Sequence, residues 1–320
     1  MGIGAALALM PFIDEAQPPS AKIHRIGFLG VTSASAFASR VEALRAGLRD
    51  LGYIEGKNIV IEFRWADGNP DRLPGLAAEL VRLKVDVLVV QSTTGARAAE
   101  QATTTIPIVM AVGADAIESG LVQSLARPGG NLTGTTILTP EISNKRVELL
   151  KEAVPRISRV AVLVRRGSSD IGMYLRTTQT AARSLGIALH VAEVLGPNEF
   201  LSAFAKMAAD HVDAIVMTND ALLVANRQEI ADLAVRHRLP SIGNGEFAEV
   251  GGLIGYGVAT PELFRHAALF VDKILKGAKP GDLPIEQATK VQLIVNLKTA
   301  KALGLTIPQS LMVRAHEVIQ

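Results

Sequence analysis

Cysteine is absent from this sequence, and aromatic residues make up only 4% of it, with Trp65 as the single tryptophan. The absence of cysteine excludes disulfide bonds, thiolate zinc sites, a cysteine nucleophile and a lipid-modified N-terminal cysteine. It leaves the compartment open, because a chain with large cores needs no disulfides. Apolar residues make up 48% of the chain, so its cores are built mostly from alanine, valine, leucine and isoleucine.

Neither sign of charge dominates, because 33 basic residues nearly balance 31 acidic ones and the net charge is only +2. No run of lysine or arginine is long enough to indicate a nucleic-acid patch. The six histidines are scattered without metal-ligand spacing, at His24, His190, His211, His237, His266 and His316. The sequence therefore predicts no metal site, no cofactor and no nucleic-acid partner.

Motifs of the common enzyme classes are missing as well. Ile26–Gly30 reads IGFLG, which is not the dinucleotide fingerprint, and no phosphate-binding loop occurs. Arg166–Gly172 reads RGSSDIG and does not match a nucleophile elbow. The glycine-rich Gly251–Gly257 is more typical of a strand end and a hinge than of a phosphate cradle. We predict that the protein is not an enzyme.

The N-terminus is apolar and small from Gly2 to Ile13 and then polar from Asp14 to Pro19. This pattern is typical of the apolar region and tail of a secretion signal, here over residues 1–21. The basic start and a clean cleavage site are missing, so the assigned start can lie downstream of the true one. A short helix or a disordered leader is the alternative. The signal predicts a periplasmic location.

From Lys22 onward, strand-like and helix-like segments alternate. The predicted strands are His24–Leu29, Asn58–Phe63, Val85–Val90 and Ile108–Val112. The predicted helices are Ser35–Leu51, Asp71–Leu83 and Thr94–Thr103. Apolar residues repeat at helical spacing in the helices and form continuous runs in the strands. This alternation predicts an α/β fold with parallel sheets and helices on both faces.

Short motifs at the ends of helices and the starts of strands in the first half recur in the second half, at offsets of about 120 to 135 residues. Four tripeptide or dipeptide pairs recur in the same order: Leu51-Gly52-Tyr53 with Leu185-Gly186-Ile187, Val85-Asp86-Val87 with Val212-Asp213-Ala214, Ile106-Pro107-Ile108 with Leu239-Pro240-Ser241, and Gly129-Gly130 with Gly251-Gly252. A chain of 320 residues is also too long for one ordinary core. We therefore predict two similar Rossmann-like lobes.

Ligands of open parallel sheets bind outside the carboxyl ends of the strands. The corresponding loops are Gly30–Ser35, Gln91–Thr94 and Val112–Asp115 in the first lobe, and Arg165–Asp170, Thr218–Ala221 and Gly243–Glu246 in the second. Two lobes that face each other across such loops form a hinged cleft, and closure around a ligand is its usual motion.

Hydroxyl side chains in the first-lobe loops can bind a carboxylate together with backbone N–H groups at a helix start. The candidates are Thr32, Ser33, Ser92, Thr93 and Thr94. Ordinary helix capping is the alternative for each of them.

The remaining candidates could contact other parts of a ligand. They are Gly113, Asp115, Ser168, Ser169, Asn219, Asp220, Asn244, Glu246 and Tyr256. Gly113 allows close backbone approach, and the carboxylates could hold an ammonium group. Tyr256 could stack on a flat ligand. Helix capping by the acidic residues and core packing of the tyrosine are the alternatives.

Three long segments resemble the ABC-transporter substrate-binding protein family that includes the tryptophan/tyrosine-type binding proteins. They are Leu48–Val90, Gly120–Gly134 and Asn144–Leu163, and the resemblance extends from Ile23 to Glu317. It implies a type I periplasmic-binding-protein fold whose lobes are joined by a three-strand hinge.

The resemblance also implies three crossings between the lobes, near Thr136–Glu141, Tyr256–Thr260 and Gln287–Lys290. The helix Pro261–Leu275 would return to the first lobe. The N-terminal lobe then comprises residues 22–137 plus 259–287, and the C-terminal lobe residues 138–258 plus 288–320.

One segment departs from the family. Its members carry an aromatic residue and an arginine shortly after the equivalent of Pro240, whereas this chain has the shorter Ser241–Glu246. This segment should form one wall of the pocket, so the resemblance does not fix the same ligand.

We predict a monomeric solute-binding component of an ABC importer that binds a small carboxylate or amino-acid-like ligand between its lobes. Its partner would be an ABC permease in the inner membrane. A ligand-sensing domain of a signalling system is one alternative, and an α/β enzyme with its active site in the cleft is another. No helix-turn-helix precedes Ile23, which argues against a complete DNA-binding repressor.

Overall fold

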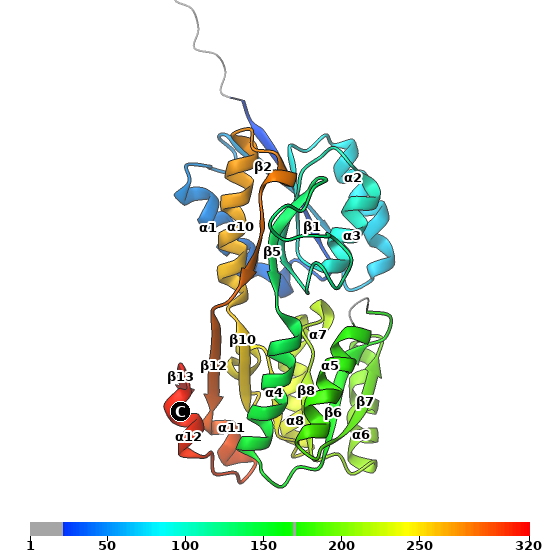
Figure 1. The fold of residues 1–320 in the computed structure, drawn as a ribbon, viewed down its shortest axis with the longest axis vertical. Helices are drawn as coiled ribbons and strands as arrows, with labels where there is room; N and C mark the ends of the chain where they lie inside the picture. The colour runs from blue at the N-terminus through cyan, green and yellow to red at the C-terminus, as the bar shows by residue number, and fades with distance from the viewer. Residues whose placement is uncertain (1–21, 169–170) are drawn as a thin grey trace, which may run out of the picture.

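The computed structural model describes residues 22–168 and 171–320, which form two lobes, each with its own sheet (Figure 1). The strand order is β11-β5-β4-β3-β1-β2 in the first sheet and β13-β12-β10-β9-β8-β6-β7 in the second. The predicted leader lies outside the described residues. Within them, every helix is too short or too polar to span a bilayer.

The first lobe follows the alternation in the sequence. Its strands are β1 (His24–Gly30), β2 (Ile59–Trp65), β3 (Val87–Val90), β4 (Ile108–Gly113), β5 (Leu132–Ile137) and β11 (Ile285–Ala288). Its helices are α1 (Ala38–Asp50), α2 (Leu73–Arg82), α3 (Thr93–Ala102) and α10 (Thr260–Leu275). All of its strands pair in parallel, as predicted.

Helices cover both faces of the first sheet. Phe28 packs with Leu44 of α1 and Phe264 of α10 in one core. Leu29, its neighbour on β1, points to the opposite face and packs with Leu80 of α2 in a second core. Consecutive residues of a strand face opposite sides, so an uninterrupted apolar strand needs a helix layer on each side.

The second lobe has the same layered plan. Its strands are β6 (Arg159–Arg165), β7 (Ala188–Val194), β8 (Ala214–Met217), β9 (Ser241–Gly243), β10 (Ile254–Val258), β12 (Val291–Asn296) and β13 (Glu317–Ile319). Its helices are α4 (Thr139–Ala153), α5 (Ile171–Ser184), α6 (Phe200–Ala209), α7 (Ala221–Ala225), α8 (Arg227–Arg236), α9 (Gly245–Glu249), α11 (Leu297–Ala302) and α12 (Gln309–Arg314). One pair departs from the predicted parallel pattern, because β12 runs antiparallel to β10. The chain enters β12 directly from the other lobe and so runs in the opposite direction.

The duplication seen in the sequence extends to individual hydrogen bonds. Asp86, just before β3, accepts a hydrogen bond of 2.7 Å from the backbone N–H of Arg25 in β1. Asp213, just before β8, accepts equivalent bonds of 2.7 and 2.8 Å from the N–H groups of Ser158 and Arg159 at the start of β6. Each aspartate therefore ties together the amino ends of two adjacent parallel strands.

Three connections join the lobes: β5 to α4, β10 to α10, and β11 to β12 (Figure 1). They confirm the predicted three-strand hinge. The second connection returns α10 to the first lobe, where it packs against α1. A Cβ at Gly47 of α1 would lie 2.5 Å from the carbonyl oxygen of Arg265, so this helix crossing requires glycine.

Candidate ligand-binding cleft

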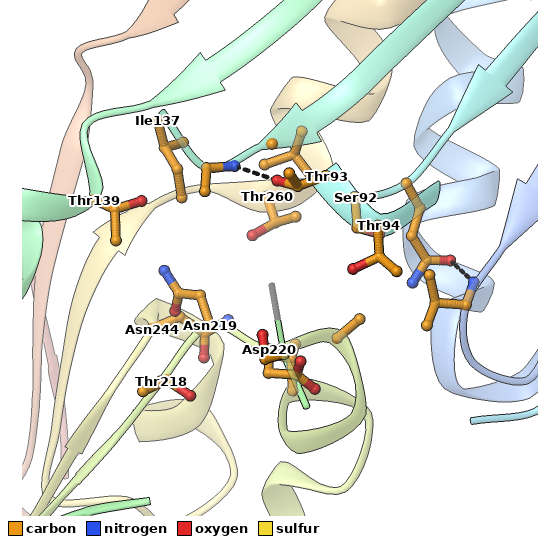
Figure 2. Close-up of a pocket in the computed structure, with 18 of the residues that line it drawn as sticks. Ser92, Thr93, Thr94, Ile137, Thr139, Thr218, Asn219, Asp220, Asn244 and Thr260 are labelled. Atoms are coloured by element: carbon orange, nitrogen blue, oxygen red, sulfur yellow. Dashed lines mark hydrogen bonds between the residues drawn. The ribbon is translucent and has the colours of Figure 1, made fainter. Parts of the chain in front are cut away.

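A cavity of about 1120 Å³, counted with its opening to solvent, lies between the lobes. Its lining residues follow the carboxyl ends of β1, β3 and β4 in the first lobe and of β6, β8 and β9 in the second. Much of the wall is aliphatic, and polar groups gather on two opposing sides (Figure 2). An apolar space with a few convergent polar groups is typical of a small-molecule site.

The start of α3 forms the polar side in the first lobe. Ser92 caps the helix, since its Oγ accepts a bond of 3.2 Å from the N–H of Gly95. The hydroxyl of Thr93 accepts a bond of 3.0 Å from the N–H of Ala114. In Figure 2 the hydroxyl of Thr94 faces the opposite lobe, and it has no hydrogen-bond partner among the described residues. Thr94 and the first N–H groups of the helix are therefore available to a carboxylate.

Asp220 lies opposite, in the second lobe, and is already engaged. Its Oδ1 caps α7 by accepting from the N–H of Leu222 at 2.9 Å, and its Oδ2 pairs with Nε of Arg165 at 2.9 Å. Asp220 therefore caps α7 and lines the cavity at the same time. The carboxylate can receive an ammonium group only through its remaining lone pairs.

Two asparagines flank Asp220 on this wall. The Oδ1 atom of Asn244 is buried and has no hydrogen-bond partner among the described residues. Asn219 accepts a bond of 3.0 Å at Oδ1 from Nη2 of Arg146, so its amide N–H group is the end left for a ligand.

Arg146, on α4, is fully buried behind this wall. Besides Asn219, its guanidinium donates to the carbonyl oxygens of Tyr256, at 2.8 and 2.7 Å, and Met217, at 3.2 Å. Burial lowers the pKa of Arg146, because the charged form loses hydration. Among the described residues no carboxylate forms an ion pair with it. The second lobe thus carries a buried positive charge beside the cavity.

A second buried arginine reaches across the cleft. Arg40 of α1 has no exposed surface, lines the cavity and donates through Nη2 to Oε2 of Glu246 on α9. Arg227 lies 3.7 Å from the same oxygen. Burial lowers the pKa of Arg40, although Glu246 acts in the opposite direction. This contact, together with an exposed pair of Arg176 and Glu118 at 3.1 Å, joins the lobes in a closed arrangement.

The structure brings eight of the predicted residues together in the cavity wall: Ser92, Thr93, Thr94, Gly113, Ser168, Asn219, Asp220 and Asn244. Whether each contacts a ligand stays a prediction.

The other candidates lie elsewhere. Thr32 and Ser33 line a separate depression between the lobes. Asp115 accepts from the N–H groups of Ile117 and Glu118 in its own turn. Glu246 binds Arg40, and Tyr256 packs beside the hinge. Ser169 is outside the described residues.

Sequence reasoning missed several lining residues, notably Arg40, Gln91, Thr139 and Thr260. Two of these carried a signal in the sequence. Thr139 and Thr260 each begin the tripeptide Thr-Pro-Glu, so the motif marks two of the three hinge connections. Gln91 belongs to the loop Gln91–Thr94, which the sequence predicts to lie at the ligand site. Arg40 gave no signal, because a charged residue in an amphipathic helix is expected at the surface.

Comparisons with known proteins agree with this arrangement. The sequence family described as "ABC transporter substrate binding protein" matches residues 25–319. A tyrosine-binding protein of Clostridioides difficile is 26% identical over 293 residues, which cover 91% of this chain and 84% of that protein.

Two solved structures are similar over nearly the whole chain. A conserved domain protein from Vibrio cholerae has 29% identity and a TM-score of 0.87, and the match covers 93% of this chain and all of that one. An ABC domain from Streptococcus pneumoniae in complex with L-Trp has 27% identity and a TM-score of 0.83, and covers 92% and 100% of the two chains.

Proposed function

Because this chain belongs to the ABC transporter substrate-binding protein family and has the type I periplasmic-binding-protein fold, we propose that it holds an amino acid or a comparable small carboxylate between its lobes. The observation that carries the proposal is the cavity between the lobes, in which the start of α3 faces Asn219, Asp220 and Asn244 (Figure 2). The relatives named for tyrosine and L-Trp support the same ligand class.

In this proposal the ligand carboxylate binds at the start of α3. It accepts hydrogen bonds from the backbone N–H groups of Thr93 and Thr94 and from the hydroxyl of Thr94. An ammonium group is received by Asp220 and by Oδ1 of Asn244, which otherwise lacks a partner. The apolar part of the ligand packs against the aliphatic wall.

The proposed biological role depends on closure of the two lobes around the ligand. Proteins of this family are extracytoplasmic and work with membrane permeases, so we place this chain in the periplasm as the receptor of an ABC importer. The first lobe comprises residues 22–137 plus 259–287, and the second comprises residues 138–258 plus 288–320. The ligand stabilises the closed form only by the contacts it gains there, and the permease recognises that form. No reaction occurs on the bound compound.

A thermal-shift screen of amino acids, aromatic acids and small carboxylates tests this function. A compound at 100 times its dissociation constant should add about 2.7 kcal/mol to the free energy of unfolding. Thr94→Val removes one hydroxyl without changing the side-chain shape, and it should weaken binding by about tenfold or more. Recovery of the bound compound unchanged checks that no turnover occurs.

Thr180→Val is the matched control, because the Thr180 hydroxyl bonds only to the carbonyl oxygen of Arg176 in its own helix. It should leave affinity at the wild-type value. The proposal fails if no carboxylate raises the melting temperature, or if Thr94→Val binds as tightly as the control.

A further inference from the structure

Two fully buried side chains on the first-lobe wall of the cavity have hydrogen-bond donors without acceptors. Arg40 is 0% exposed, and its Nε and Nη1 atoms have no partner among the described residues. Gln91 is 2% exposed, and its Nε2 atom likewise lacks a partner. A buried donor without an acceptor destabilises the folded protein, and a charged donor does so more strongly. No described oxygen accepts from these three atoms, and Oε1 of the neighbouring Glu246 is itself without a partner. An acceptor from outside the chain would satisfy them.

Both side chains are held in place by the protein. Oε1 of Gln91 accepts a bond of 3.1 Å from the N–H of Val31, so the amide nitrogen is the free end. The Arg40 guanidinium lies 4.5 Å from the centre of the Phe37 ring and is anchored by Glu246 through Nη2. Val31 and Phe37 also line the cavity, so the two donors sit beside an apolar surface.

Gln91 follows β3 and adjoins the carboxylate site, whereas Arg40 lies apart from it. In the first sheet β3 lies between β1 and β4. Arg40 and Phe37 follow β1, whereas the start of α3 follows the central β3. A ligand whose carboxylate is at Thr94 can therefore extend its apolar part past Val31 and Phe37 towards Arg40.

Resting on the proposed function, we propose that the side chain of the ligand ends in an oxygen acceptor, such as a hydroxyl, amide or carboxylate, which Arg40 and Gln91 bind. Arg40 is then a specificity-determining residue. A site built to hydrogen-bond a polar group rejects the analogue that lacks it, because the buried donors are left unpaired. Purely hydrocarbon side chains are therefore the disfavoured ligands.

Matched ligand pairs measured by calorimetry test this inference. L-tyrosine and L-phenylalanine differ by one hydroxyl, and L-asparagine and L-leucine have similar shapes but differ in polarity. In at least one pair, the oxygen-bearing member should bind the wild-type protein ten times more tightly or better. Arg40→Met should reduce that ratio to near one.

Glu246→Gln removes the ion pair between the lobes but keeps Arg40, so it distinguishes an effect on ligand specificity from an effect on closure of the lobes. If Arg40 served only to join the lobes, Arg40→Met and Glu246→Gln would weaken both members of a pair equally and leave the ratio unchanged, which would overturn the inference. Gln91→Glu keeps the acceptor for Val31 but removes the free donor, and it should also lower the ratio. This variant provides the test if Arg40→Met does not fold.

The inference also fails if the hydrocarbon member binds as tightly as its oxygen-bearing partner in both pairs, or if none of the four compounds binds while another carboxylate does. Failure of every compound in the wider screen would instead remove the proposed function itself.

Discussion

Arg146 is a buried cation whose hydrogen bonds to Tyr256, Met217 and Asn219 all reach neutral oxygens. Taking a guanidinium out of water is costly, and the cost is offset only while these acceptors stay in place. A lysine at this position keeps the charge but has a single ammonium group, which cannot reach three separate acceptors.

We expect Arg146→Lys to lower the free energy of unfolding by about 2–4 kcal/mol, since a buried network loses several bonds. Ligand affinity should also fall, because Asn219 is then free to rotate. Urea unfolding and calorimetry measure the two effects. Arg156→Lys, at an exposed position, should stay within about 0.5 kcal/mol of the wild type. An equally small effect of Arg146→Lys would show that these bonds contribute little.

At the level of the strands, Asp213 fixes the start of β6 through the N–H groups of Ser158 and Arg159. Partial burial acts to raise the pKa of Asp213, but these hydrogen bonds outweigh it, and the pKa is lowered. A carboxyl with a lowered pKa in the folded state contributes stability above its unfolded pKa of about 3.9, and that contribution is lost as the pH falls through the folded pKa.

Asp213→Asn should therefore destabilise the protein by about 1–2 kcal/mol at pH 7, and the difference from the wild type should shrink below about pH 4. Urea unfolding at several pH values gives this difference directly. The exposed Asp71→Asn serves as the control and should show no comparable loss. A gap that stays constant down to pH 3 would mean that the charge of Asp213 is not what matters.

Most elements of the first lobe could be predicted from the sequence. Val85–Val90 and Asp71–Leu83 carry strong strand and helix patterns, and β3 and α2 lie within them. β5 was not predicted as a strand, because LTGTTI has no apolar run and is buried only through its neighbours. The cleft loops followed from the topology of parallel sheets. Arg40 and Arg146 could not be found, since what buries them is the packing of other elements far away in the sequence.

At the scale of the molecule, two ion pairs between described residues cross the cleft, and their surroundings are very different. The Arg40–Glu246 pair is largely buried, whereas the side chains of Arg176 and Glu118 are 71% and 43% exposed. Exposed pairs contribute about 0–1 kcal/mol, while removal of one partner from a buried pair leaves an uncompensated charge. Closure should therefore depend mainly on the buried pair.

Glu246→Gln should shift the ligand-free protein towards an open form and lower ligand affinity by about tenfold or more, because Arg40 and Arg227 lose their shared carboxylate. Glu118→Gln should change neither property. Small-angle scattering with and without ligand measures the radius of gyration of each form. A larger opening in Glu118→Gln than in Glu246→Gln would reverse this assignment.

The bonds of Arg146 have a consequence for engineering. One guanidinium binds both Asn219, which lines the cavity, and the carbonyl of Tyr256 on β10, the strand that leads into the hinge. Mutations at Arg146 should therefore change the ligand affinity and the angle between the lobes together. Substitutions meant to change the proposed ligand specificity without this coupling are better placed on the opposite wall, around Gln91 and Thr94.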